Sequence, residues 1–307
     1  MNFIYCLDKN YNTQAIMSFY TLNKFVNETI NVYVVHNKPE TLMDELKKFN
    51  FNNLIFKFLK FENKVALPNL KNSHVTEATY YRIFAINLLD IEIEDIIYVD
   101  SDILFNKNPA SEFKKCLEVL KSSDFTISAS TIGRYKKVDE ETDRYFEYLG
   151  MDDKYFNAGV MLVNLQEWKN NNYSVKANLL IQELKEKARF WDQDILNSLI
   201  DSNYYTLQNK LNFKTVGVGE NRSLENVIFV HYSGKSKPWD AGGVFEEAAL
   251  IYHKFFRQLF KNEFHIKVKN RRNALNKMFN YRSYYKFLKT GELIRYLVYS
   301  FIAILKK

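Results

Sequence analysis

Residues 96–105 read IIYVDSDILF, two apolar runs that flank an Asp-Ser-Asp tripeptide. The first run, Ile96 to Val99, consists of β-branched and aromatic residues and is typical of a strand that is buried on both faces. Burying the carboxylates of Asp100 and Asp102 beside such a strand is costly unless a cation or hydrogen-bond donors compensate their charge. The stretch therefore predicts a buried sheet with a polar site at the end of one strand.

Other apolar runs resemble this strand and alternate with helical patterns. The runs are 3–7, 31–36, 53–59, 125–130 and 159–165. Apolar residues recur at helical spacing in 13–26, 174–184 and 192–199. Continuous apolar strands that alternate with helices indicate an α/β fold, in which a mostly parallel sheet is covered by helices on both faces.

Composition indicates a globular protein that has no disulfide framework. The 307 residues are 47% apolar and contain only 9 Gly and 4 Pro, which excludes collagen-like and disordered chains. Cys6 and Cys116 form no CxxC pair. The first residues lack the basic segment of a signal peptide, and the apolar run 293–305 is too short to span a bilayer and contains Arg295. We expect a reduced, cytoplasmic protein.

Charge is divided unevenly along the chain. The formal net charge is +7, but residues 264–307 hold 11 Lys or Arg and one acid, Glu292, which leaves residues 1–263 with a net charge of −3. We therefore expect a mildly acidic body with a basic C-terminal segment.

Polar residues gather next to several predicted strands. DKNY (8–11) follows the first strand, YFNAG (155–159) overlaps the start of the last, and HYSGKSKPW (231–239) follows the apolar run 227–230. Ligands of open α/β sheets bind beyond the carboxyl ends of the strands. These segments are thus expected to meet Asp100 and Asp102 around one ligand.

Asp100, Asp102 and His231 form a candidate metal site. If the segment stays extended, the side chains at 100 and 102 point to the same side and converge on one ion. Carboxylate oxygens suit Mg²⁺ or Mn²⁺, and an added histidine favours Mn²⁺. Alternatively, the two acids cap a helix or accept backbone hydrogen bonds, and His231 is an ordinary half-buried histidine. Gly234 and Lys237 add a close backbone approach and a point charge, both of which suit a diphosphate.

Six stretches occur in the order found in the retaining glycosyltransferases of family 8, which include bacterial lipopolysaccharide α-galactosyl- and α-glucosyltransferases and glycogenin. They are DKNY (8–11), TYYR (79–82), YVDSDILF (98–105), YFNAGVMLVNL (155–165), WDQDILN (191–197) and HYSGKSKPW (231–239). The chain resembles this family over about residues 1 to 260. HxxGxxKPW after a D-x-D is the most specific of these signals.

The resemblance implies a GT-A fold, a Rossmann-like mixed sheet that binds a UDP-sugar with Mn²⁺ or Mg²⁺. Asp100, Asp102 and His231 would hold the metal, and Tyr11 would stack on the uracil base. The positions that match the family's donor site are Asp8, Asn10, Tyr11, Arg82, Asp100, Ser101, Asp102, Asn157, Ala158, Asp192, Gln193, His231, Gly234 and Lys237. Among them, Gly234 and Lys237 match phosphate contacts.

The implied reaction moves galactose or glucose, with retention of configuration, from UDP to a saccharide acceptor in lipopolysaccharide, lipooligosaccharide or other cell-surface glycan synthesis. Asp192 and Gln193 are the candidate catalytic residues. Asp192 would be the natural nucleophile of a double displacement, whereas the neutral amide of Gln193 is a poor one. Front-face attack assisted by UDP is the mechanism that we favour.

Several of these residues also have structural explanations. Tyr11 could cover the end of the sheet, 157–159 could be a turn before a strand, and Arg82 could pair with Glu77. Asp194 fits the first turn of a helix, stabilised by the macrodipole, and Trp191 and Trp239 fit packing roles. For the whole protein, a nucleotide-sugar hydrolase or nucleotidyltransferase and a non-catalytic basic scaffold stay open. No P-loop and no GxGxxG is present, so kinase and dinucleotide-binding functions lack support.

Residues 264–307 are expected to form a basic, aromatic, helical segment after a GT-A domain at 1–263. It could lie on a membrane surface, bind nucleic acid, or pack on the body or a partner chain. The apolar run 293–305 favours the membrane surface, because a nucleic-acid-binding face would stay wet. We therefore expect peripheral association with the anionic inner face of the plasma membrane, and no nucleic-acid partner.

Overall fold

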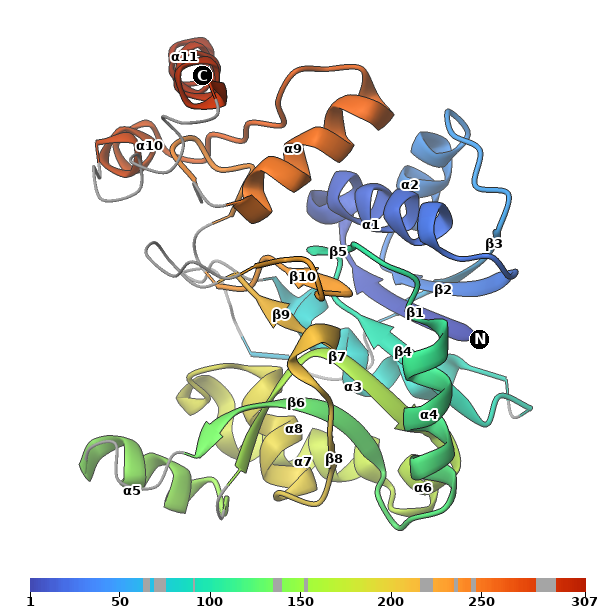
Figure 1. Cartoon of the computed structure of the whole chain (residues 1–307). Coiled ribbons are helices and arrows are strands. Elements are labelled where there is room, and N and C mark those ends of the chain that lie inside the picture. Colours follow the sequence, from blue (N-terminus) through green and yellow to red (C-terminus); the bar gives the residue numbers. More distant parts are fainter. Residues whose placement is uncertain are drawn as a thin grey trace.

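A seven-stranded sheet runs through the middle of the molecule in the computed structural model (Figure 1). The order of its strands is β3-β2-β1-β4-β7-β6-β8. The structure describes residues 1–62, 67–68, 76–90, 92–134, 140–151, 154–215, 223–234, 237–243, 247–279 and 291–307.

The six predicted strands are all present in this sheet. The strands are β1 (Asn2–Leu7), β2 (Ile30–His36), β3 (Leu54–Lys60), β4 (Asp95–Val99), β6 (Ile127–Arg134), β7 (Lys154–Asn164) and the short β8 (Tyr205–Thr206). Neighbouring strands are parallel except where β7 pairs antiparallel with β4 and β6. The mixed, mostly parallel α/β sheet is therefore confirmed.

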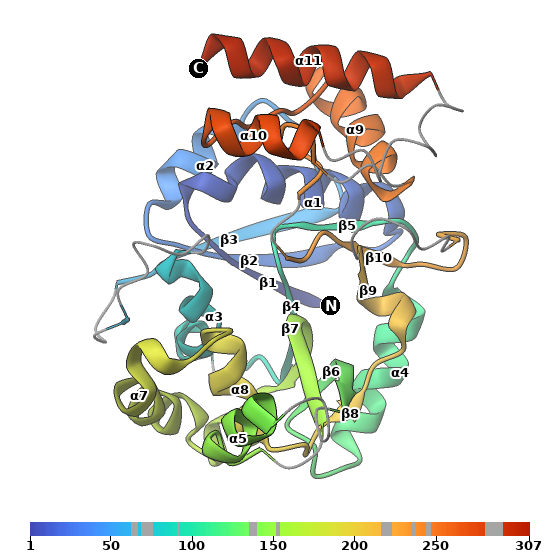
Figure 2. The same ribbon diagram turned by 90° about the vertical axis from the view of Figure 1, so that its left-hand side faces the viewer.

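Helices cover both faces of the sheet, as predicted (Figure 2). Along β1, Phe3 and Tyr5 join one buried cluster, and Ile4 and Cys6 join the other, because successive side chains of a strand point to opposite faces. The first cluster lies under α1 (Asn12–Phe25), α2 (Pro39–Leu46) and α4 (Ala110–Lys121). The second lies against α3 (Tyr81–Ala85), α5 (Glu140–Tyr148), α6 (Leu165–Asn170), α7 (Tyr173–Leu184) and α8 (Asp192–Ile200).

A second, three-stranded sheet lies above the carboxyl end of β4. It consists of β5 (Ile103–Phe105), β10 (Phe229–His231) and β9 (Phe213–Lys214), with β10 in the centre. β10 pairs antiparallel with β5, so that His231 lies opposite Ile103. This pairing brings the histidine next to the Asp-Ser-Asp tripeptide, although the two are far apart in the sequence.

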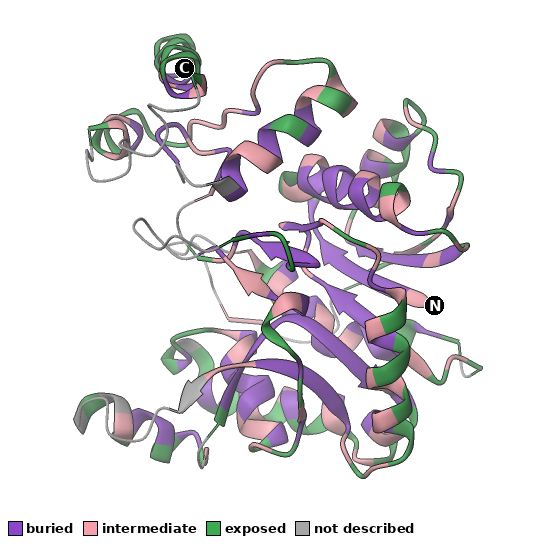
Figure 3. Ribbon diagram, viewed as in Figure 1, coloured by how far each residue is buried: buried purple, intermediate pink, exposed green. Residues whose placement is uncertain are grey.

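Three helices in the described residues after 246 follow the sheets. α9 (Glu247–Phe260) packs along α1, and α10 (Arg271–Met278) and α11 (Glu292–Lys306) lie beyond it (Figures 1 and 2). One side of α11 is buried, through Leu293, Tyr296, Ser300 and Ile304. Its other side is exposed and largely apolar (Figure 3). No helix in the described part of the chain is long and apolar enough to cross a bilayer.

Candidate active site

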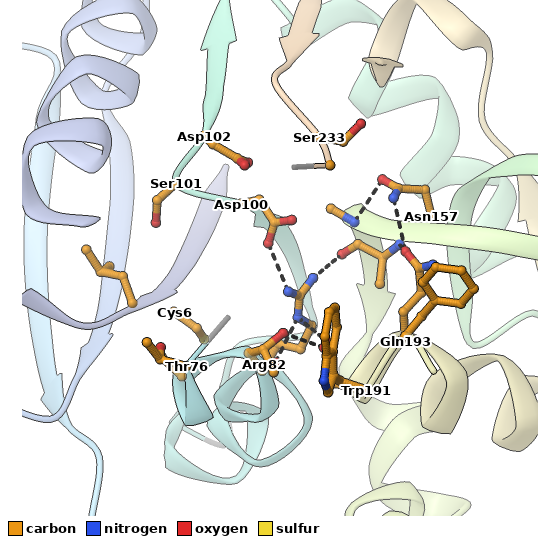
Figure 4. A pocket seen from close by; sticks show the side chains of 18 of the residues that line it. Cys6, Thr76, Arg82, Asp100, Ser101, Asp102, Asn157, Trp191, Gln193 and Ser233 are labelled. Atoms are coloured by element: carbon orange, nitrogen blue, oxygen red, sulfur yellow. Dashed lines mark hydrogen bonds and ion pairs between the residues drawn. The ribbon is translucent and has the colours of Figure 1, made fainter. Parts of the chain in front are cut away.

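A cavity of about 910 Å³ opens at the carboxyl ends of β1 and β4. Nearly all of the predicted site residues line it: Asp8, Tyr11, Arg82, Asp100, Ser101, Asp102, Asn157, Ala158, Asp192, Gln193, His231, Gly234 and Lys237. Asn10 is exposed and is not among the lining residues. Figure 4 shows the wall formed by Asp100, Asp102, Arg82 and Gln193.

The Asp-Ser-Asp tripeptide is a turn rather than an extended segment. The carbonyl of Asp100 accepts a hydrogen bond from the amide of Ile103, with an N–O distance of 3.2 Å, and the turn joins β4 to β5. The expectation that the two side chains converge because the backbone is extended is therefore wrong. They converge because the turn and the β5–β10 pairing bring both carboxylates to the imidazole of His231.

Asp100, Asp102 and His231 are close enough to hold one metal ion. Nε2 of His231 lies 3.4 Å from Oδ1 of Asp102 and 3.7 Å from Oδ2 of Asp100. One potential ligand atom from each residue lies within 4.8 Å of the others. Oδ1 of Asp102 is buried and has no hydrogen-bond partner among the described residues. Two carboxylates and one imidazole suit Mn²⁺, so this donor set fits the ion that the sequence predicts.

Each carboxylate uses its other oxygen to contact a cationic side chain. Oδ1 of Asp100 lies 3.1 Å from the Arg82 guanidinium and accepts a 2.6 Å hydrogen bond from the Tyr98 hydroxyl. Oδ2 of Asp102 lies 2.5 Å from Nζ of Lys237. Burial alone would raise the pKa of Asp102, but the Lys237 ammonium acts in the opposite direction, and the pKa lies well below its usual range. Asp102 is therefore ionised at neutral pH.

The proton of His231 is placed by a residue that sequence analysis missed. Nδ1 of His231 lies 2.8 Å from Oδ1 of Asn212, while the amide nitrogen of Asn212 donates to Oδ1 of Asn157 at 2.8 Å. An amide oxygen can only accept, so Nδ1 carries a proton, and in the neutral imidazole Nε2 presents its lone pair to Asp100 and Asp102. This is the tautomer that a metal ligand requires.

The chain of hydrogen bonds continues from Asn157 to α8. Oε1 of Gln193 accepts from the Asn157 amide at 3.0 Å and from the backbone amide of Ala158 at 3.1 Å. Nε2 of Gln193 donates to the Tyr155 hydroxyl at 3.0 Å, and that hydroxyl donates to Oδ1 of Asp194 at 2.6 Å. The orientations of the three side-chain amides, of Gln193, Asn157 and Asn212, are therefore determined along the chain of hydrogen bonds from Asp194 to His231.

Arg82 lies at the centre of the cavity wall. Its side chain is 9% exposed, and Nη1 donates to the carbonyl of Ala158 at 2.6 Å. Nε lies 2.8 Å from Oδ2 of Asp192, which also accepts, through its other oxygen, a hydrogen bond from Thr79. The suggested structural partner Glu77 is wrong: Arg82 pairs with Asp100 and Asp192, and Glu77 accepts a hydrogen bond from Tyr81 instead.

Asp192 is the buried acid of this pair. Its side chain is 3% exposed. Burial raises its pKa to about 6, although Arg82 and Thr79 act in the opposite direction. The carboxyl group therefore changes its charge near neutral pH rather than in acid.

Asp8 and Tyr11 lie at the other end of the cavity, after β1. Asp8 is buried, and its carboxylate accepts a hydrogen bond from the amide of Asn10 at 2.8 Å. Tyr11 ends the single 3-10 turn η1 (Lys9–Tyr11) and lines the cavity. Burial raises the pKa of Tyr11 to about 12, so the phenol is neutral.

The structural explanations have mixed outcomes. Residues 157–159 lie inside β7 rather than in a turn, and a Cβ on Gly159 would come within 2.3 Å of the His231 ring. Asp194 lies in the first turn of α8, as expected, and accepts hydrogen bonds from two tyrosines and the Phe190 amide. Trp239 is buried among aromatic rings, which confirms its packing role.

Trp191 combines two properties that sequence patterns do not reveal. Its ring is partly buried and lines the cavity (Figure 4). Its backbone has φ 51° and ψ −123°, a conformation that residues other than glycine rarely adopt. The strained residue lies directly before Asp192, at the start of α8.

Comparison with known proteins supports the resemblance to the glycosyltransferases of family 8. The family model described as glycosyl transferase family 8 matches residues 2–243. General stress protein A of Bacillus subtilis is 27% identical over 266 residues, which cover 78% of this chain and 88% of that protein. A lipopolysaccharide 1,2-glucosyltransferase of Escherichia coli is 26% identical over 259 residues, which cover 76% of this chain and 71% of the enzyme.

The fold is that of a solved galactosyltransferase. LgtC, in complex with donor and acceptor sugar analogs, matches with a TM-score of 0.62 and 19% identity over 89% of this chain and 100% of LgtC. This likeness confirms the predicted GT-A fold. Since the family model covers most of the chain and the six motifs surround one cavity, the chain belongs to glycosyltransferase family 8.

Proposed function

We propose that this glycosyltransferase uses a UDP-hexose, UDP-galactose or UDP-glucose, and transfers the sugar to a saccharide acceptor with retention of configuration. The observation that carries the proposal is the convergence of Asp100, Asp102 and His231, with Lys237 beside them, at one cavity. Two acids, a neutral imidazole and a lysine suit a metal-bound diphosphate, whose negative charge grows as the sugar leaves.

Asp100, Asp102 and His231 would hold Mn²⁺, with Mg²⁺ as the alternative. When bound, the ion would supply positive charge to the diphosphate leaving group. Lys237 would donate to the same group, since its buried ammonium already lies beside Asp102. Gly234 has φ +83° and open space where a Cβ would be, so its backbone can approach a phosphate closely.

The nucleoside would occupy the end of the cavity after β1. Tyr11 would stack on the uracil base, and Asp8 and Asn10 would contribute polar contacts. Ser101 supports this placement, because its hydroxyl is buried, lines the cavity and has no hydrogen-bond partner among the described residues. A ligand that occupied the cavity would satisfy it.

The hexose would lie against Arg82, Asn157, Ala158, Asp192 and Gln193, which line the opposite end of the cavity. Galactose and glucose differ in the orientation of one hydroxyl, at C4. A site that hydrogen-bonds a hydroxyl discriminates strongly against a sugar that lacks it there, because its buried polar groups are then left unpaired. Arg82 and Asp192, which form an ion pair, would make that distinction.

For the mechanism we favour front-face attack over double displacement. The carbonyl oxygen of Gln193 already accepts two hydrogen bonds, from Asn157 and Ala158. The carboxylate of Asp192 is engaged by Arg82 and Thr79. Neither group is presented as a free nucleophile, whereas a departing UDP can assist the acceptor hydroxyl on the same face. A covalent sugar trapped on Asp192 would contradict this mechanism.

The acceptor would be a saccharide of the cell surface, as in lipopolysaccharide or lipooligosaccharide. Because such acceptors are attached to lipid, we propose that the exposed face of α11 lies on the inner surface of the plasma membrane. Its exposed apolar residues are Ile294, Val298, Tyr299, Phe301, Ile302 and Leu305. Exposed cations of the same segment, Arg271, Arg272 and Lys306 among them, suit anionic headgroups.

The test is UDP release from a panel of UDP-hexoses, with Mn²⁺ or with a chelator, by the wild type and by Asp102→Asn. We expect slow hydrolysis of one donor that requires both the metal and Asp102, and faster release when an acceptor is present. Asp44→Asn, an exposed acid outside the cavity, is the matched control and should match the wild type. Turnover that persists with chelator or in Asp102→Asn would contradict a metal-dependent site, and turnover of no donor would contradict the UDP-hexose.

A further inference from the structure

We propose that Lys267 and Tyr296, two residues of the C-terminal segment 264–307, position the turn 237–243 that carries Lys237 into the donor site. The inference rests on the proposed function, because it assigns a task in donor binding to a segment for which the sequence favours a membrane surface. Both residues are positioning residues, and neither lines the cavity.

Tyr296 holds the turn from the side of α11. Its side chain is buried, and its hydroxyl lies 2.8 Å from the carbonyl oxygen of Pro238 and 2.7 Å from that of Asp240. Nε2 of His253, on α9, lies 2.8 Å from the same Pro238 carbonyl. Because Pro238 directly follows Lys237, these bonds hold the backbone one residue from the ammonium group that contacts Asp102.

Lys267 ties the turn to the nucleoside end of the site. Its backbone amide donates to the carbonyl of Trp239 at 2.6 Å, and its ammonium group donates to the carbonyl of Asn10 at 2.8 Å. Asn10 belongs to η1, the 3-10 turn that places Tyr11 in the cavity. One residue of the C-terminal segment therefore joins the two backbone segments that flank the donor site.

Two further described residues of the segment, Lys277 and Met278, lie directly against the same turn. Nζ of Lys277 is 2.5 Å from Oδ2 of Asp240. Gly242 has φ +64°, and a Cβ built on it would come within 2.5 Å of the backbone nitrogen of Met278. So close an approach of two backbones leaves the turn little room to shift.

The contacts to the turn 237–243 determine the position of the Lys237 ammonium. It is held between Oδ2 of Asp102, at 2.5 Å, and the carbonyl of Tyr232, at 2.6 Å. Misplacing a catalytic group by about 1 Å can cost about 100-fold in rate, so the support of this turn matters for function. Lys267 and Tyr296 would then affect the donor site through the turn 237–243. The exposed face of α11 takes no part in this and stays available to the membrane surface.

The test compares Tyr296→Phe and Lys267→Met in the full-length chain with Tyr299→Phe and Lys269→Met, the same changes on exposed parts of the segment. The readouts are the Kd for UDP with Mn²⁺ by calorimetry, the KM for the UDP-hexose, and the Tm. Loss of one hydrogen bond, which is buried for Tyr296 and exposed for Lys267, should raise the Kd about threefold to tenfold. Lys267→Arg, which keeps a donor, should recover part of the affinity, and the exposed variants should match the wild type.

A purely structural role makes a different prediction. It would lower the Tm of Tyr296→Phe and Lys267→Met and leave the Kd for UDP and the KM unchanged, which would overturn the inference. Failure of the wild type itself to bind UDP would overturn the proposed function and, with it, this assignment. The two failures are therefore distinguishable in one set of titrations.

Discussion

Arg82 and Asp192 form an ion pair, with 2.8 Å between Nε and Oδ2, inside the wall of the cavity. Arg82 is the second residue of α3 and Asp192 is the first residue of α8, and the guanidinium lies 3.1 Å from Asp100 of the candidate metal site. One buried cation thus joins the acid at the predicted sugar end to an acid of the metal site. A substitution of Arg82, Asp192 or Asp100 should therefore change the position or the charge of the other two.

Arg82→Lys should be far from conservative. Lysine keeps the charge but lacks the planar fork, so it cannot serve Asp100, Asp192 and the Ala158 carbonyl together. Breaking a buried ion pair costs about 3–5 kcal/mol, and we expect lysine to lose about half of this in stability. kcat/KM for the donor should fall about 100-fold. Steady-state kinetics would show it, with Arg271→Lys on the exposed side of α10 as the control; equal losses in both variants would contradict the role.

Asp192 should make the stability of the protein depend on pH in an unusual direction. Its pKa rises from 3.8 to about 6 on folding, so the native state binds the proton more tightly than the unfolded chain. The contribution is fully present below pH 3.8 and is lost as the pH rises through about 6. Relative to Asp192→Asn, the free energy of unfolding of the wild type should fall by up to about 3 kcal/mol across this window.

Urea denaturation at a series of pH values measures this difference. Asp44→Asn, at a carboxyl group that is 70% exposed, should follow the wild type at every pH. Parallel profiles for the wild type and Asp192→Asn would show that the buried carboxyl group does not carry the shift.

Asn212→Leu should weaken metal binding, although it replaces none of the three proposed metal ligands. Leucine has a similar volume, but it removes the acceptor that fixes the proton on Nδ1 of His231. Loss of such a partner typically costs about 10–100-fold in metal affinity. Calorimetric titration with Mn²⁺ measures it, and ¹⁵N NMR of the imidazole reports the tautomer. Asn203→Leu, an exposed change, is the control; an unaltered affinity would mean that the tautomer is set in another way.

The exposed face of α11 should bind vesicles that contain anionic lipid. Replacing Ile294, Val298 and Phe301 by serine should lower the partition coefficient at least about tenfold, because each side chain loses apolar area that would enter the interface. Replacing Met43, Val175 and Leu179, exposed on α2 and α7, is the matched control and should have no effect. Equal co-sedimentation of both triple variants would contradict membrane docking through α11.

Local patterns predicted the strands, and the resemblance to family 8 named most of the residues that line the cavity. The apolar runs correspond to β1–β4, β6 and β7 because buried parallel strands need continuous apolar sequence. Asp100 and Asp102 stood out because two acids inside apolar sequence require compensation. Asn212 gave no such signal: it lies in an ordinary polar and apolar mixture, and its importance arises only from Asn157 and His231, which are distant in sequence.

The C-terminal segment shows the same limit. Its composition predicted a basic, partly apolar helix, and α11 is one, but composition says nothing about which face packs inward. The face that carries Tyr296 meets the turn at Pro238, 58 positions earlier in the chain. Long-range hydrogen bonds of this kind depend on how the elements dock.

The sequence by itself determined the α/β class and the strands, because the periodicity of burial is a local property, and the order of its motifs indicated which groups converge on the cavity. Only the tertiary structure decided how those groups act together: the Asp-Ser-Asp turn, the tautomer of His231, the Arg82–Asp192 pair and the bracing of 237–243. Each of these depends on distances between residues far apart in the chain, and such distances exist only after the two sheets and their helices have packed.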